Sequence, residues 1–149
     1  MSARRAWARV AAVGAAVLVA DQVTKALVRA DVQPGEHIEL LPFLDLVHVR
    51  NDGIAFGALG GSGIVLALVI AAVVGIVAFF ATHTDRRGAW LTTGLLLGGA
   101  LGNVIDRIRI DAVTDFLKLP HWPAFNVADI AITVGVISLV FVLDDRPRR

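Results

Sequence analysis

The sequence predicts an α-helical membrane protein with four transmembrane helices and a small extracytoplasmic β-structure. Apolar residues make up 56% of the 149 residues, and 14 glycines raise that share to roughly 65%, against roughly 45–50% in soluble domains. The mean hydropathy is +0.72. Four apolar stretches approach the length of about 20 residues that a helix needs to cross the hydrocarbon core. We expect one integral membrane domain over residues 1–149.

The expected spans cover about residues 7–28, 63–81, 89–107 and 124–143. The second span is the clearest, because its 19 residues carry no charge. The first is the least regular, since it carries Arg9, Asp21 and Lys25. Its start also resembles a cleaved signal peptide, with a basic beginning before AAVGAAVLVA. The apolar pattern that resumes beyond Asp21 favours a longer helix instead.

The distribution of basic residues places both termini in the cytoplasm. The N-terminus, the link between the second and third spans and the C-terminal tail hold eight basic and three acidic residues, whereas the rest of the chain holds six basic and ten acidic ones. Lys and Arg are retained on the cytoplasmic side. The extracytoplasmic segments then cover about residues 29–62 and 108–123. In the first, HIELLPFLDLVHV predicts a short, bent pair of strands, and AFGALGG after it a short helix or a re-entrant turn.

Two helical patterns predict contacts between the spans. Asp21 and Lys25 are four residues apart, so they share one helix face and can form an ion pair. Gly94, Gly98 and Gly102 recur at every fourth position, and this small-residue spacing lets a second helix approach closely. The third span therefore has a face suited to packing against another helix.

A polar face follows the glycines at the outer end of the third span. Asn103, Asp106 and Arg107 lie three and four residues apart and share one side of the helix. A simpler interpretation is a snorkelling cluster in which Asp106 pairs with Arg107. Asn103 lies deeper than such a cluster requires, which favours a functional role.

Further acids and amides are expected at the same boundary. Asn126 and Asp129 have the spacing of a helix N-cap and its capping-box partner. Asp115 in VTDFLKL is, taken alone, an ordinary loop acid, and Asn51 belongs to an Asn-Asp-Gly turn. Each residue has a structural explanation on its own. Their convergence on one water–lipid boundary indicates a site, in which Asp106 is as good a catalytic candidate as Asp115 or Asp129.

Several function classes are disfavoured. The chain has no cysteine, which excludes disulfides and thiolate nucleophiles. It has no HExxH, P-loop or GxSxG motif, so we expect no metal site and no cofactor. A proton-coupled transporter would need an acid near mid-bilayer, yet the acids gather at one end. A non-catalytic scaffold would explain the glycine face but not the Asn/Asp sets.

Five motifs together resemble the lipoprotein signal peptidases, the bacterial signal peptidase II family. They are DQVTK at 21–25, RNDGIAFG at 50–57, GGALGNVIDR at 98–107, VTDF at 113–116 and FNVADIAI at 125–132. The resemblance implies an aspartyl endopeptidase of the bacterial inner membrane. It would remove the signal peptide from prolipoproteins, cutting before a cysteine that carries diacylglycerol. The implied fold has four transmembrane helices, with a β-cradle and a short extracytoplasmic helix that both map onto residues 29–62.

The resemblance also implies the roles of the site residues. The catalytic dyad falls on Asp115 and Asp129. Support and substrate-binding roles fall on Asp21, Lys25, Asn51, Gly102, Asn103, Asp106, Arg107 and Asn126. We rank Asp106 below the dyad because the adjacent Arg107 favours its permanent ionisation. The implied partners are a diacylated prolipoprotein, membrane lipid and an inhibitor of the globomycin type, with no nucleic acid, and we expect a monomer.

Overall fold

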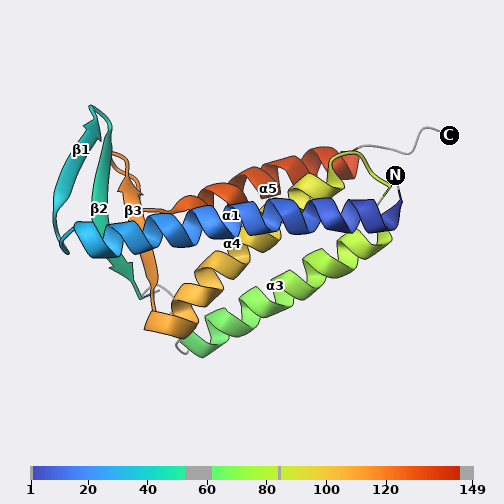
Figure 1. Cartoon of the computed structure of the whole chain (residues 1–149), viewed down its shortest axis with the longest axis horizontal. Coiled ribbons are helices and arrows are strands. Elements are labelled where there is room, and N and C mark those ends of the chain that lie inside the picture. The colour runs from blue at the N-terminus through green and yellow to red at the C-terminus, as the bar shows by residue number, and fades with distance from the viewer. Residues whose placement is uncertain (1, 53–61, 84, 145–149) are drawn as a thin grey trace.

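In the described part of the chain, four long helices form a bundle with a small sheet at one end (Figure 1). The computed structural model describes residues 2–52, 62–83 and 85–144. Within these residues the helices are α1 (Ala3–Asp31), α3 (Ser62–Thr82), α4 (Ala89–Ile110) and α5 (Val127–Asp144). Helix α1 begins and α5 ends at the end of the bundle away from the sheet (Figure 1). The short helix expected in AFGALGG falls on residues 55–61, outside the described part of the chain.

The outer faces of the helices are apolar and exposed, as on a surface that contacts lipid. On α5, the exposed fractions are 55% for Ile137, 62% for Val140 and 72% for Phe141, and Leu68 and Val74 are similarly exposed on α3. Soluble monomers rarely expose a continuous apolar patch of this kind. Of the described helices, α1 and α5 are long and apolar enough to cross a bilayer. The crossing of all four helices stays a prediction.

Helix α4 packs closely against α1 through its glycines. A Cβ atom built on Gly98 would lie 2.7 Å from the carbonyl oxygen of Gly14, and one on Gly94 would lie 2.7 Å from the Cβ atom of Val13. Real Cβ atoms do not approach other atoms this closely, so a larger residue would force the helices apart. The contact predicted from the glycine spacing is confirmed, and it holds the polar face of α4 against α1.

The sheet contains the predicted pair of strands and a third strand that the sequence did not suggest. Strands β1 (His37–Leu41) and β2 (Leu44–Asn51) are antiparallel, and β3 (Val113–Lys118) pairs antiparallel with β2. The sheet is therefore not confined to residues 29–62. The first four residues of β3 are buried on both faces, so it lacks the alternation of apolar and polar residues that marks a half-exposed strand.

Candidate active site

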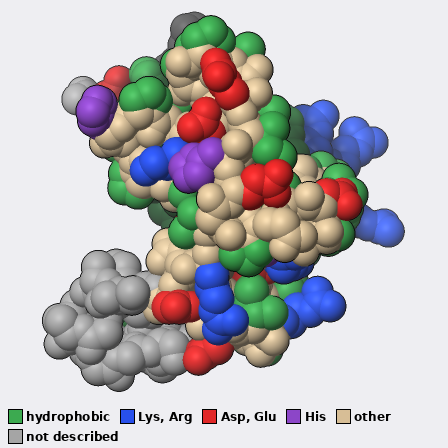
Figure 2. Space-filling view, turned by 90° about the vertical axis from the view of Figure 1, so that its left-hand side faces the viewer, with side chains coloured by type: hydrophobic (Ala, Val, Ile, Leu, Met, Phe, Trp, Pro, Cys, Tyr) green, Lys and Arg blue, Asp and Glu red, His purple; other side chains and the backbone are tan. Residues whose placement is uncertain are grey.

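The acids and amides meet where the sheet adjoins the ends of α1, α4 and α5. Helices α1 and α4 both contact β3 in this region, and α5 begins nine residues after β3 ends. Acidic side chains are visible among apolar ones on this end of the molecule (Figure 2). One polar cluster next to the sheet thus contains side chains from α1, α4, α5, β2 and β3.

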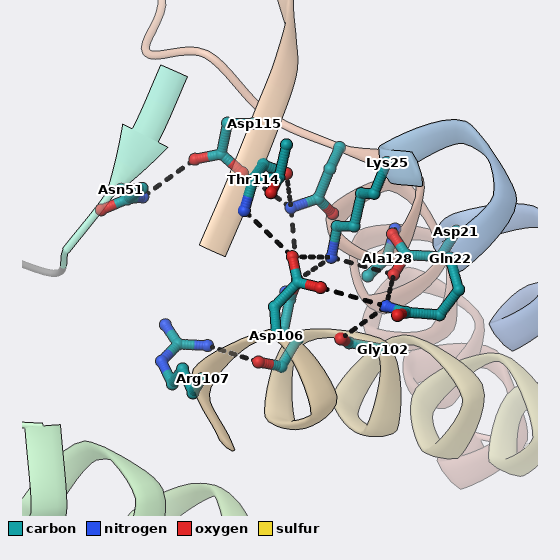
Figure 3. Close-up of polar contacts among 12 residues, drawn as sticks. Asp21, Gln22, Lys25, Asn51, Gly102, Asp106, Arg107, Thr114, Asp115 and Ala128 are labelled. Atoms are coloured by element: carbon teal, nitrogen blue, oxygen red, sulfur yellow. Dashed lines mark hydrogen bonds and ion pairs between the residues drawn. The ribbon is translucent and has the colours of Figure 1, made fainter. Parts of the chain in front are cut away.

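Asp115 is placed by the pairing of β3 with β2. The register sets Asp115 opposite Val49, and the side chain is only 2% exposed. Its two carboxylate oxygens accept hydrogen bonds from amide groups, at 2.9 Å from Nδ2 of Asn51 and at 2.7 Å from Nδ2 of Asn126. The first of these bonds is drawn in Figure 3. Asp115 is therefore a buried carboxyl group held on both oxygens.

Burial raises the pKa of Asp115 from 3.8 to about 6. The hydrogen bond from Asn51 opposes this shift, whereas the negative charge of Asp129 adds to it. A carboxyl group in such surroundings keeps its proton at a pH where an ordinary Asp has lost it. The site therefore contains an acid that can act as a proton donor up to a pH of about 6.

Asp129 is held at the start of α5 by a capping box with Asn126. Oδ1 of Asn126 accepts a hydrogen bond from the backbone N–H of Asp129 at 2.9 Å. In return, Oδ2 of Asp129 accepts one from the backbone N–H of Asn126 at 3.2 Å. The capping box predicted from the spacing is confirmed. The remaining oxygen, Oδ1, accepts a hydrogen bond from Nδ2 of Asn103 at 2.9 Å.

Two asparagines join the two aspartates in one chain of hydrogen bonds. Nδ2 of Asn126 donates to Asp115 at 2.7 Å and to Oδ1 of Asn103 at 3.2 Å, and Asn103 donates to Asp129. The negative charge of Asp129 reaches Asp115, as the pKa of Asp115 shows. The carboxyl groups thus belong to one electrostatically coupled unit.

A buried cation, Lys25, lies between Asp21 and Asp106 (Figure 3). Lys25 is fully buried, and its Nζ atom lies 2.9 Å from Oδ2 of Asp21 and 3.3 Å from Oδ2 of Asp106. The pairing of Asp21 with Lys25 predicted from the sequence is confirmed. Nζ also donates a hydrogen bond to Oδ1 of Asn103 at 2.9 Å. All three ammonium hydrogens therefore have acceptors.

Asp106 has different partners from the expected one. Its cationic partners are Lys25 and Arg29, the latter at 3.6 Å, and Oδ2 also accepts the backbone N–H of Thr114 at 3.0 Å. The expected pairing with Arg107 is wrong, because Arg107 donates instead to the backbone carbonyl of Asn103 at 3.3 Å. Consecutive residues on a helix point about 100° apart and do not face each other. Asp106 thus anchors β3 one residue before Asp115.

Asp21 ties α1 to the first turn of α5. Its Oδ1 atom accepts the backbone N–H of Ala128 at 2.9 Å, which is one of the donors that a helix start leaves without an intrahelical acceptor. A Cβ atom on Gly102 would overlap the Asp21 carboxylate, so glycine is required at this point of α4. The carbonyl oxygen of Gly102 accepts a hydrogen bond from Nε2 of Gln22 at 3.1 Å.

All ten residues named from the sequence lie in this connected cluster, although their chemical roles stay predictions. Sequence reasoning missed Gln22, Arg29 and Thr114. Arg29 continues the helical face of Asp21 and Lys25 at the next four-residue step, and that spacing could have identified it. Thr114 had no such signal, because its role depends on β3.

Two cavities are lined by residues of this polar cluster. One, of about 480 Å³, lies between α3, α4 and α5, and has Asn103 and Arg107 as its polar lining among apolar side chains. The other, of about 260 Å³, is lined by Asp129 with Trp122, Ile130 and other largely apolar residues. The polar site therefore borders apolar space that suits a hydrophobic substrate.

Comparison with known proteins shows the family to which the chain belongs. Residues 13–143 match the family model described as Signal peptidase (SPase) II. The chain belongs to the signal peptidase II family. As a member of this family it is a protease, and the exposed apolar helices fit a protein of a bacterial membrane. The resemblance stated from the five motifs is thereby confirmed.

Relatives within the signal peptidase II family cover most of the chain. The lipoprotein signal peptidase of Thermodesulfovibrio yellowstonii is 42% identical over 129 residues, which cover 84% of this chain and 87% of the relative. That of Moorella thermoacetica is 42% identical over 130 residues, covering 85% and 87%. A solved bacterial membrane enzyme superposes with a TM-score of 0.81 at 30% identity, covering 92% of this chain and 91% of that one.

Proposed function

We propose that this protein is an aspartyl endopeptidase in which Asp115 and Asp129 activate water to cleave the signal peptide of a lipoprotein precursor. The observation that carries the proposal is the joining of the two carboxyl groups through Asn103 and Asn126. Peptide hydrolysis by carboxyl groups needs one that holds a proton and one that accepts a proton. The raised pKa of Asp115 beside Asp129 supports such a division.

In the proposed reaction each aspartate takes up one proton and gives up one proton. The ionised aspartate takes a proton from water, whose oxygen forms a bond to the scissile carbonyl carbon, while the protonated aspartate gives its proton to the carbonyl oxygen. In the resulting tetrahedral diol, the first aspartate returns a proton to the peptide nitrogen as the C–N bond breaks. The second takes back a hydroxyl proton as the new carboxyl group forms. Both aspartates then have their starting protonation states.

The substrate that fits this site is a peptide with hydrophobic parts on both sides of the scissile bond. The relatives are named lipoprotein signal peptidases. The apolar cavity lined by Asp129 and the one lined by Asn103 and Arg107 suit a precursor whose signal peptide precedes a diacylglyceryl-modified cysteine. Cleavage N-terminal to that cysteine would leave both products, the signal peptide and the lipidated protein, in the bilayer. We propose the same substrate class here, with an inhibitor of the globomycin type competing for the site.

A membrane topology follows from the same proposal. Four spans place the site near the extracytoplasmic face, with both termini in the cytoplasm, as the basic residues favour. Helix α1 starts and α5 ends at the bundle end opposite the sheet, which agrees with an even number of crossings (Figure 1). The enzyme would act as a monomer in contact with lipid.

Supporting roles follow from the contacts. Asn51 and Asn126 orient Asp115, and Asn103 orients Asp129. Arg107 lines the larger cavity and can bind a substrate carbonyl. Two more acids are structural in this proposal: Asp21 fastens α1 to α5, beside Gly102, and Asp106 fastens α4 to β3.

Cleavage of a synthetic diacylated prolipoprotein in proteoliposomes tests the proposal. The protein should release the signal peptide, with mass spectrometry locating the cut before the lipidated cysteine. Asp115→Asn and Asp129→Asn should each lose at least about 10³-fold in kcat while inserting normally, because neither variant retains both proton-transfer groups. Near-normal turnover by either variant would contradict the dyad.

A further inference from the structure

Lys25 is a buried cation that the reaction described above does not use. Its side chain has no exposed surface, and its ammonium group contacts Asp21, Asp106 and Asn103. Taking an ammonium group out of water is costly unless its partners repay that cost. Two of these partners are carboxylates, but the third is a neutral amide that touches Asp129. That third contact connects the cation to the proposed dyad.

The contact with Lys25 fixes which way the Asn103 amide points. An ammonium group only donates hydrogen bonds, so it can face the amide oxygen and not the amide nitrogen. Nδ2 of Asn126 donates to the same oxygen at 3.2 Å. With two donors on its oxygen, the Asn103 amide presents its N–H₂ group to Asp129 at 2.9 Å. A reversed amide would set its nitrogen against Lys25 and its oxygen against the Asp129 carboxylate.

Resting on the proposed function, we propose that Lys25 is a positioning residue that acts through Asn103 to make Asp129 the aspartate that begins the reaction ionised. Asp129 also lies in the first turn of α5, where the helix macrodipole favours a negative charge. Asp115 is buried in β3 and begins with the proton. Asp129 then takes the proton from water, and Asp115 protonates the carbonyl oxygen.

The charged groups around Asp129 come from three elements within the described part of the chain. Helix α1 contributes Asp21 and Lys25, α4 contributes Asp106 and Arg107, and β3 contributes Asp115. Asp21 and Asp106 are both bound to cations or backbone donors. Lys25 is the member of this set that contacts the amide bound to Asp129, so its removal should change the ionisation of Asp129 specifically.

The test compares the double variant Lys25→Met/Asp21→Asn with the single variant Asp21→Asn, both of which lack the Lys25–Asp21 ion pair. The double variant removes both charges of the pair together and leaves Asp106 with Arg29. Asp21→Asn is the matched control, because it retains Lys25 and its hydrogen bond to Asn103. Lys25→Met alone is not used, because it leaves two buried carboxylates without this cation and is expected to fold poorly. The double variant and the control are assayed as full-length protein in proteoliposomes with the diacylated peptide, at a series of pH values.

In the double variant, kcat should fall about tenfold with KM unchanged, and the acid limb of the pH profile should move about one unit higher, because kcat/KM reports the ionisation of the free enzyme. The control should keep the wild-type acid limb, whatever its rate. An acid limb at the wild-type position in the double variant, or an equal shift in the control, would overturn the role of Lys25.

Asp115→Asn and Asp129→Asn, assayed beside these variants, separate the two proposals. If both are inactive while the Lys25 double variant keeps the wild-type acid limb, the dyad stands and only the role of Lys25 fails. If either retains turnover, the dyad itself fails, and the role of Lys25 fails with it.

Discussion

The side-chain amide of Asn126, which directly precedes α5, donates a 2.7 Å hydrogen bond to Asp115 in β3, 11 residues earlier in the chain. Asn126 is fully buried, and its amide oxygen caps the helix that carries Asp129. One side chain therefore positions both aspartates. Helix capping and the geometry of the proposed dyad depend on the same residue, and substitutions can separate these two functions.

Asn126→Ser should keep most of the stability and lose most of the activity. Serine caps helices nearly as well as asparagine, but it is shorter and lacks the amide N–H₂ group that donates to Asp115. Asn126→Ala removes the cap as well, at a cost of about 1 kcal/mol. Cleavage rates and thermal unfolding in detergent are to be measured for both variants. Normal turnover by Asn126→Ser would show that Asp115 needs no amide from α5.

Asp106→Asn should reduce stability more than it reduces chemistry. The substitution leaves Lys25 and Arg29 with one carboxylate fewer and weakens the acceptor for Thr114, and breaking a buried pair in this way costs about 3–5 kcal/mol. Denaturant titration of the purified protein measures the loss. Asp45→Asn is the control, because the Asp45 side chain is 39% exposed and its ion-pair partner in the described part of the chain is His37, at 3.6 Å. A stable but inactive Asp106→Asn protein would make Asp106 a catalytic candidate again.

Stability should fall as the pH rises through the range set by Asp115. Its pKa is raised from 3.8 to about 6 in the folded protein, so the folded state binds more protons than the unfolded chain between these values. The free energy of unfolding then decreases with rising pH in this window. Melting temperatures measured across the window should show this slope for the wild type and a flatter one for Asp115→Asn. Equal slopes would mean that other groups set the dependence.

Activity should fall as the pH rises above about 6, where Asp115 loses its proton. Asn51→Ala should move this alkaline limb to higher pH, because the hydrogen bond from Asn51 lowers the pKa of Asp115. Asp52→Asn is the matched control, since it changes the next residue, which pairs with Arg50. The pH profile of kcat/KM measures the limb. A limb that stays in place in Asn51→Ala would contradict the role given to this bond.

Gly102→Ala should destabilise the protein, whereas Gly75→Ala should not. A methyl group on Gly102 would overlap the carboxylate of Asp21 and push α1 from α4, but one on Gly75 in α3 meets no atom within 4 Å. Because alanine favours a helix over glycine by about 1 kcal/mol, Gly75→Ala is expected to be neutral or stabilising. Thermal unfolding of both variants decides this. Equal stability of the two variants would show that α1 can move away from α4 without a loss of stability.

The sequence predicts the helical parts of the site better than the parts that depend on the sheet. The spacing of Asp21 with Lys25, the glycine face of α4 and the capping box at Asn126 are local patterns, and each appears as expected. Helical spacing determines which side chains share a face, so these contacts follow from neighbours three or four residues apart.

The contacts that were missed or wrong join segments distant in the sequence. Asp106 was paired with its neighbour Arg107, yet its cations come from α1, more than 75 residues away in the chain. The sequence does not predict strand β3, because both of its faces are buried and it lacks the alternation of apolar and polar residues typical of a half-exposed strand. Without the pairing of β3 with β2, the sequence does not predict where the Asp115 side chain lies. Its ranking above Asp106 came from the family resemblance rather than from a physical pattern.

The hydrogen bond from Ala128 to Asp21 has a consequence for biosynthesis. It joins α1 with α5, the earliest and the latest of the described helices in the order of synthesis, across 107 residues. Asp129 lies one residue further on, so the proposed dyad is incomplete until α5 has left the ribosome and entered the bundle. A nascent chain that ends with α4 lacks both Asp115 on β3 and Asp129 on α5. Proteolytic activity would therefore begin only after α5 has been synthesised and has packed against α1.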